Sequence, residues 1–192
     1  MKVHISLAAS AALLALSPVN ATLAAPAKNA ATEVPSQLPR NAAPLHYGIT
    51  VTPNAEKLSF DGNVLIEFLL KTPSDSVTLN AADIDFRRVT IAKGRAAAMP
   101  ATTTVNAAAQ TATIAFGKKL PAGRYTLNID YSGKILQQAN GLFALDYKDP
   151  QGAEKRALFT QFEAPDARRF VPSWDEPNYK ATFDLTATVP AE

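Results

Sequence analysis

Cysteine is absent from this chain of 192 residues, and histidine occurs only twice. Without cysteine there is no disulfide, so a domain of this size must be stabilised by its core alone. Hydrophobic residues make up 47% of the chain, which is enough for one such core. A catalytic zinc normally takes three protein ligands, chiefly histidines. We therefore assign neither a metal ligand nor a catalytic residue to this chain.

A strong excess of charge is also missing. The chain has 19 basic and 17 acidic side chains, and the basic ones are scattered, which argues against nucleic-acid binding. It contains no G-x-S-x-G nucleophile motif and no glycine-rich phosphate loop. No apolar run reaches the roughly 20 residues of a transmembrane helix, so we expect no membrane span in the mature form.

The N-terminus has the pattern of a secretory signal. Lys2 precedes an apolar stretch over residues 5–16, and small residues follow, with cleavage expected after Ala24 or Ala27. A short buried helix is the alternative. We interpret residues 1–27 as a signal peptide with an approximate end, which predicts a periplasmic or secreted protein.

Two further segments follow the signal. Residues 28–43 are rich in alanine, proline and asparagine without periodicity, and are interpreted as a flexible leader. Residues 44–192 alternate apolar and polar side chains in short runs, as half-buried antiparallel strands do. The predicted strands cover residues 47–51, 60–68, 77–79, 86–91, 112–116, 125–131 and 183–189. Turn chemistry separates them, for example at residues 132–133 and 149–152, so the fold class predicted is an all-β, multi-sheet antiparallel β-sandwich.

Residues 160–177, with the sequence TQFEAPDARRFVPSWDEP, combine four acids, two adjacent arginines, a glutamine and the only tryptophan. Period-two geometry would place Gln161 and Glu163 on one face and turn Phe162 into the core. From the residues alone, a polar pair on an exposed strand face is the alternative.

This segment resembles a signature of the N-terminal domain of the M1 zinc aminopeptidases (aminopeptidase N-like), T-Q-F-E-x-x-x-A-R-R-x-F-P-C-x-D-E-P. Ser173 stands where cysteine is common, a position we expect to serve packing. Weaker likenesses occur at residues 44–49, 123–127 and 140–143, so the resemblance covers nearly all of the mature chain. It implies a saddle of antiparallel sheets. It also implies zinc in a separate catalytic domain with an H-E-x-x-H motif, which this chain lacks.

The resemblance further implies that Gln161 and Glu163 bind the free α-amino group of peptide N-termini. A carboxylate suits an ammonium group because the two form a charge-assisted hydrogen bond. Asp166, Arg168 and Arg169 are expected to form a structural ion-pair network. Trp174 is expected to be buried, with a sugar-stacking platform as the alternative.

Two other groups are expected to be structural. His46 lies at the start of a predicted strand. Asp83 and Asp85 are two residues apart in a strand-like run, which would place both on one solvated face, and such a pattern serves solubility more often than it forms the acid pair of a glycosidase.

Two functions remain open. The first is the N-terminal β-domain of an exported zinc aminopeptidase, a peptide hydrolase, which would cap the catalytic domain and help to bind the substrate's α-amino group. The second is a free-standing periplasmic β-sandwich that binds a protein partner or a glycan. We interpret the chain as a fragment whose β-domain is incomplete at its C-terminus, and we expect it to be inactive by itself. Coding sequence after Glu192 would separate the two functions.

Overall fold

The computed structural model of this protein describes residues 37–190. The predicted signal peptide, at 1–27, and residues 28–36 of the predicted leader lie outside the described residues. Within 37–190 the chain forms strands and one short 3-10 helix. In chain order these are β1 (Ala42–Asn54), β2 (Ser59–Leu70), β3 (Ser74–Asn80), β4 (Ile84–Ala92), β5 (Met99–Pro100), β6 (Thr102–Asn106), β7 (Thr111–Leu120), β8 (Gly123–Lys134), β9 (Gly141–Lys148), β10 (Glu154–Gln161), η1 (Ala167–Arg169) and β11 (Thr182–Ala187).

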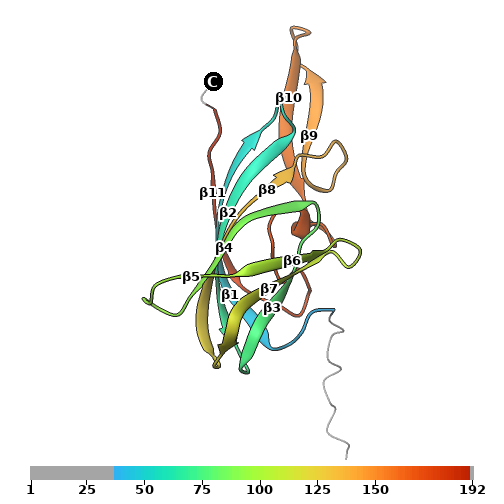
Figure 1. The fold of residues 1–192 in the computed structure, drawn as a ribbon. Helices are drawn as coiled ribbons and strands as arrows, with labels where there is room; N and C mark the ends of the chain where they lie inside the picture. The colour runs from blue at the N-terminus through green and yellow to red at the C-terminus, as the bar shows by residue number, and fades with distance from the viewer. Residues whose placement is uncertain (1–36, 191–192) are drawn as a thin grey trace, which may run out of the picture. The chain divides into compact units, whose positions relative to one another are not determined.

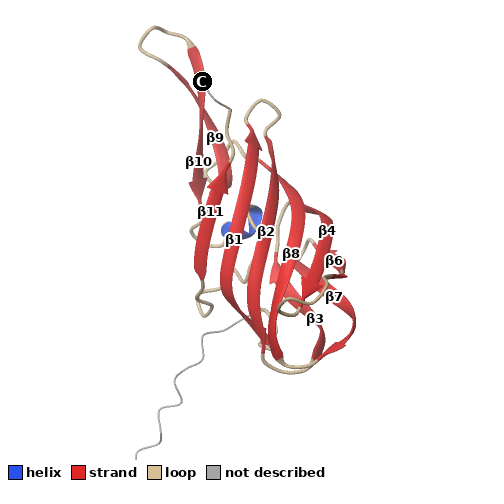
Figure 2. Ribbon diagram, turned by 90° about the vertical axis from the view of Figure 1, so that its left-hand side faces the viewer, coloured by secondary structure: helices blue, strands red, loops and turns tan. Residues whose placement is uncertain are grey.

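The strands form three sheets (Figure 1). The largest has the order β11-β1-β2-β8-β4-β5, a second has the order β3-β7-β6, and β9 pairs with β10 in a hairpin. Figure 2 looks onto the six-stranded sheet, with β3, β7 and β6 behind its lower part. Inner side chains of both larger sheets belong to one core. The predicted all-β, multi-sheet sandwich is confirmed.

The core follows from period-two alternation. Val64, Ile66 and Phe68 on β2 are fully buried, and so are Leu127 and Ile129 on the neighbouring strand β8. The intervening residues face outward and are polar for the most part, as expected for a sheet with one covered face. Apolar burial of this kind stabilises a fold by about 25 cal/mol for each Å² removed from water.

Two glycines let large aromatic rings cross between β2 and β8. Gly62 pairs with Tyr131, and Phe60 pairs with Gly133. A Cβ on either glycine would lie 2.4 Å from the facing ring. Gly133 is therefore part of β8, and the prediction of a turn at residues 132–133 was wrong. A glycine in a strand can mark close packing as well as a turn.

The folded region begins earlier than predicted. Leu38 and Ala42 are buried in the core, and β1 starts at Ala42. The Glu176 Oε1 atom accepts hydrogen bonds from the backbone N–H groups of Gln37 and Leu38, at 2.7 and 3.1 Å. The predicted leader of residues 28–43 therefore overlaps the folded domain, because a contact from a distant segment holds a stretch that has no periodicity of its own.

The last strand also differs from its prediction. β11 pairs with β1 in parallel, whereas alternation suggested an antiparallel strand. It lies at the edge of the sheet, and Phe183 and Leu185 are 59% and 61% exposed. Alternation describes the two faces of a strand but does not determine the direction of its neighbour.

The hairpin strands β9 and β10 were not predicted. The first four residues of β9 are buried and its last four are exposed, so the strand carries no period-two signal. The turn predicted at residues 149–152 is present and joins the two strands. The distal part of this hairpin stands clear of the other sheets (Figure 1).

We expect Gly62→Ala to destabilise the domain by about 1–3 kcal/mol, since the added methyl overlaps the Tyr131 ring. Gly48→Ala is the matched control on β1, because its nearest neighbour would be Leu65 at an ordinary 3.8 Å. The control should be neutral or slightly stabilising. Urea unfolding measures both, and equal midpoints for the two variants would contradict the account of the glycine–aromatic pair.

The exposed apolar edge of β11 predicts self-association of this chain, because unpaired strand edges template pairing with another chain. Leu185→Lys should reduce the weight-average mass measured by sedimentation at high protein concentration. Thr186→Lys is the control, since it adds the same charge to the same strand without removing an apolar side chain. A wild-type chain that stays monomeric at every concentration would refute this prediction.

Candidate functional site

The segment that follows β10 runs behind the six-stranded sheet, and η1 lies behind β1 and β2 in Figure 2. It is tied to the end of β3 by backbone hydrogen bonds. Asn80 N–H donates to Ser173 O at 2.8 Å, and Ser173 N–H donates to Asn80 O at 3.1 Å. Ala82 N–H donates to Arg168 O at 2.9 Å. These bonds give an irregular segment a defined position.

Aromatic contacts seal the segment onto the sheet. Phe170 packs on Phe60, with ring centroids 5.6 Å apart, and Trp174 packs on Phe68 at 5.8 Å. Trp174 is only 5% exposed, and its backbone N–H donates to the Tyr47 hydroxyl at 3.0 Å. Burial raises the pKa of Tyr47. The prediction that Trp174 is buried is confirmed, so it offers no face for stacking a sugar.

Arg168 holds the segment together from inside. Its side chain is almost fully buried, and Nε donates to Asp175 Oδ2 at 2.9 Å. Nη2 donates to the backbone carbonyl of Asp175 at 3.1 Å, and Nη1 to Gln110 Oε1 at 3.3 Å. Removing one partner of a buried ion pair costs about 3–5 kcal/mol. The predicted structural role of Arg168 is confirmed.

Two further ion pairs join Arg169 to two acids. Its Nε donates to Asp166 Oδ1 at 2.8 Å, and its Nη1 donates to Asp83. The remaining Asp166 oxygen accepts a hydrogen bond from Asn140 Nδ2 at 3.0 Å. Asp83 precedes β4 with a φ of 55°, so the prediction that it shares a strand face with Asp85 was wrong. Asp83 instead serves as an ion-pair partner of Arg169, which is distant from it in the sequence.

Gln161 and Glu163 lie where β10 ends and a turn begins. Gln161 is the last residue of β10 and pairs with Gly141 of β9. Its Oε1 accepts a hydrogen bond from the Glu163 backbone N–H at 3.0 Å. Both side chains are exposed, and the described residues offer the Glu163 carboxylate neither a hydrogen bond nor an ion pair. The structure thus places the two residues side by side, as a single local unit.

Phe162 does not point into the core as alternation predicted. It is 38% exposed and rests on Phe170, with ring centroids 5.2 Å apart. Alternation fails here because the strand stops at Gln161, so the next residues no longer follow a strand's two faces.

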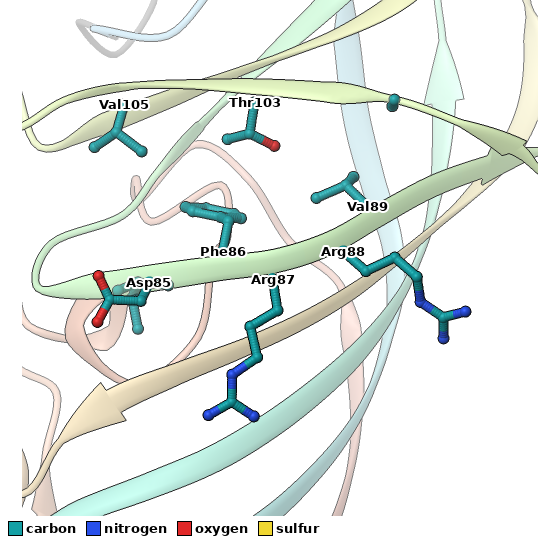
Figure 3. A pocket seen from close by; sticks show the side chains of 9 residues that line it. Asp85, Phe86, Arg87, Arg88, Val89, Thr103 and Val105 are labelled. Atoms are coloured by element: carbon teal, nitrogen blue, oxygen red, sulfur yellow. The ribbon is translucent and has the colours of Figure 1, made fainter.

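A cavity of about 430 Å³ lies between β4 and β6 but carries no catalytic constellation (Figure 3). Phe86 points toward Thr103 and Val105, whereas the side chains of Arg87 and Arg88 point away from those two residues (Figure 3). Polar and apolar residues both line the cavity, and Asp85 contributes the single carboxylate. A paired acid and base, or a nucleophile with its base, is therefore missing there.

The two arginines face outward together because a bulge separates Phe86 from Arg88 in the pairing of β4 with β8. Arg87 pairs with Asp61, and Arg88 Nε donates to Asp130 Oδ2 at 2.8 Å. Hydrogen bonds from Asn63 and Arg88 hold the pKa of the Asp130 carboxyl below its ordinary value. Sequence reasoning missed this network, since alternation indicates a polar face but gives no sign of the bulge.

His46 serves the edge of the sheet. Its Nδ1 lies 2.8 Å from Thr182 Oγ1, and its Nε2 lies 3.5 Å from Asp184. These contacts join β1 to β11 and confirm a structural role. Among residues 37–190, no three side chains of metal-ligating type are grouped around a common point. That same part of the chain contains no helix long and apolar enough to span a bilayer.

Comparison with known proteins places this geometry in context. Residues 43–192 match the family described as the Peptidase M1 N-terminal domain. Aminopeptidase N of Acetobacter pasteurianus is 43% identical over 156 residues, covering 81% of this chain and 43% of that protein. Aminopeptidase M1-B of Oryza sativa subsp. japonica is 33% identical over 159 residues, covering 82% of this chain and 18% of that protein.

A yeast relative, aminopeptidase 2, mitochondrial, of Saccharomyces cerevisiae, is 35% identical over 154 residues, covering 78% of this chain and 16% of that protein. The chain therefore spans less than half the length of these three relatives. The match extends over nearly all the described strands, and it includes Gln161, Glu163 and the anchored segment from Asp166 to Asp175. The chain belongs to the peptidase M1 N-terminal domain family.

Proposed function

We propose that this chain is the N-terminal β-domain of an exported zinc aminopeptidase, in which it caps the catalytic domain and helps to bind the free α-amino group of peptide substrates. Gln161 and Glu163 are the residues proposed for that binding. Family membership supports the aminopeptidase setting. The reaction of the whole enzyme would be hydrolysis of the N-terminal peptide bond.

The observation that carries this proposal is the state of Glu163. Its backbone is held by Gln161, while its carboxylate is exposed and has no partner among the described residues. An unpaired carboxylate on a fixed backbone suits an ammonium ligand, because a charge-assisted hydrogen bond then forms with little reorganisation. The other acids of the segment are already used. Asp166 and Asp175 pair with arginines, and Glu176 accepts backbone hydrogen bonds.

The β9–β10 hairpin supports the capping role. Leu145, Tyr147 and Phe159 are each about half exposed, at 49%, 50% and 48%. The pairing of Phe143 with Phe159 and of Leu145 with Ala157 places these side chains on the same face as Gln161. An exposed apolar face is typical of a surface that another domain covers. That face would bring a catalytic domain next to the proposed amine site.

Zinc would belong to the catalytic domain. The described residues hold no group of metal-ligating side chains, so they do not fit such a site. When bound, zinc supplies an activated water for hydrolysis. The part proposed for this chain is confined to holding the peptide's N-terminus.

The alternative is a free-standing periplasmic β-sandwich that binds a glycan or a protein partner. Burial of Trp174 removes the feature that favoured a glycan. The apolar hairpin face would also suit a protein partner, so a free-standing sandwich that binds another protein remains the alternative to test. Reading the coding sequence after Glu192 separates the two, since an H-E-x-x-H motif downstream would identify the aminopeptidase.

In the full-length enzyme, Glu163→Ala should lower kcat/KM for substrates with a free N-terminus by about ten- to several-hundred-fold. A hydrogen bond to a charged group contributes about 1.5–3 kcal/mol, and its loss can cost more. Zinc content and the urea midpoint should stay unchanged, because Glu163 is exposed and has no partner in the described fold. Discrimination against N-acetylated peptides should shrink.

Glu154→Ala is the matched control for this experiment. Glu154 is an exposed carboxylate on the same hairpin, paired with Lys148 at 3.2 Å, and it lies at the opposite end of β10 from Gln161. It should leave kcat/KM unchanged. Full activity of the Glu163 variant on free N-termini would assign amine recognition to another residue.

Export is the remaining part of the proposal, and the pattern of Lys2, residues 5–16 and the small residues near Ala24 and Ala27 motivates it. The intact mass of the mature protein should lack roughly the first 24–27 residues. Leu14→Arg, which places a charge in the apolar stretch, should retain the full mass and keep the protein in the cytoplasm. A wild-type protein that begins at Met1 in the cytoplasm would rule export out.

A further inference from the structure

The turn that carries Glu163 is held at both of its ends. At its start, Gln161 pairs with Gly141 in the β9–β10 ladder. At its end, Asp166 reaches back to Asn140, the residue that precedes Gly141, through the 3.0 Å hydrogen bond from Nδ2 to Oδ2. These residues therefore form a closed ring: Asn140 is bonded in sequence to Gly141, Gly141 pairs with Gln161, the turn leads from Gln161 to Asp166, and Asp166 is hydrogen-bonded to Asn140.

We propose that this closed ring, completed by the Asn140–Asp166 hydrogen bond, positions Glu163 for amine recognition. Asn140 and Asp166 are then positioning residues, and so is Gln161. The inference has a structural half, that the ring holds the turn with Glu163, and a functional half, that this holding aids amine recognition. Only the functional half rests on the proposed function of Glu163.

The Asp166 carboxylate is built to hold such a ring. The residue is only 8% exposed, and each of its oxygens has a partner. Oδ1 accepts from Arg169 Nε at 2.8 Å, and Oδ2 accepts from Asn140. Because Arg169 also pairs with Asp83, ahead of β4, the ring is attached to the body of the fold. A buried carboxylate with two fixed donors has little freedom to move.

Gly141 allows the ring to close tightly. Its φ is +61°, and an added Cβ would lie 3.0 Å from Arg169 Cβ. Residues that carry a side chain rarely adopt such a backbone conformation, so glycine at this position lets the chain turn directly against Arg169. The start of β9 is thereby set against the same arginine that binds Asp166.

Gln161 acts inside the ring. Its side-chain oxygen is already occupied by the Glu163 backbone N–H, at 3.0 Å. This bond fixes the backbone from which the Glu163 carboxylate projects. The inference therefore gives Gln161 a holding role, in addition to any contact of its amide nitrogen with substrate. A carboxylate held in advance binds more tightly, because less freedom is lost on binding.

The structural half is tested by amide hydrogen exchange on the 192-residue chain. Asn140→Ala should speed exchange of the Glu163 amide by about ten- to a hundredfold, as expected when a hydrogen bond to a charged group is lost. Asn106→Ala is the matched control. Asn106 is an exposed asparagine whose Oδ1 accepts from Ala109 N at 3.0 Å, in the turn between β6 and β7. It should leave the Glu163 amide unchanged.

The functional half is tested in the full-length enzyme. Asn140→Ala should lower kcat/KM for free N-termini about tenfold or more while sparing N-acetylated peptides, a split that general destabilisation would not produce. Added to Glu163→Ala, it should cause no further loss, since the ring acts through Glu163. Asn140→Ser, which keeps a small polar side chain, serves if the alanine variant does not fold.

The outcomes separate the two ideas. If Glu163→Ala impairs the enzyme but the Asn140 variants do not, the ring does not position Glu163, and the proposed function survives. If Glu163→Ala has no effect, the proposed function fails, and the exchange experiment still decides whether the ring holds the turn. Unchanged exchange at the Glu163 amide in Asn140→Ala would overturn the inference altogether.

Discussion

Backbone pairing between Asn80 and Ser173 connects the end of β3 to the irregular segment that follows β10, and much of the fold depends on it. Both residues donate and accept, at 2.8 and 3.1 Å, and the Asn80 side-chain oxygen also accepts from Asp175 N–H at 3.1 Å. Asn80 is fully buried. An irregular segment has no sheet ladder of its own, so buried polar groups must find partners of this kind elsewhere.

With the segment in place, its apolar and charged side chains take different roles. Phe170 and Trp174 cover the inner face of the six-stranded sheet, while Arg168 and Asp175 neutralise each other beneath the surface. Fully paired buried charges stabilise a fold little by themselves, but removing one partner is strongly destabilising because it leaves an uncompensated buried charge. The same segment that closes the core is also joined to the residue before the hairpin, through the hydrogen bond from Asn140 to Asp166.

The residues proposed to act in function lie where the anchored segment meets the exposed β9–β10 hairpin. The turn with Glu163 lies between the anchored segment and the β9–β10 hairpin, whose apolar face is open. A rigid support with one unpaired carboxylate suits recognition of a charged group, because pre-organisation preserves binding energy. The hairpin face and the exposed β11 edge would both suit coverage by further protein. The known relatives are much longer than this chain.

The sequence by itself determined the fold class, most strands of the two larger sheets and the identity of the signature segment. Alternation in β2 and β8 is readable because one face is buried and the other is solvated. The structural roles of Arg168 and Trp174 also followed from residue type. Tertiary structure alone decided that β11 runs parallel to β1, that Gly133 lies in a strand, and that Asp83 and Asn140 join the signature through Arg169 and Asp166. These features depend on contacts between residues far apart in the chain, and a local pattern carries no information about which distant side chain will fill a space or satisfy a charge.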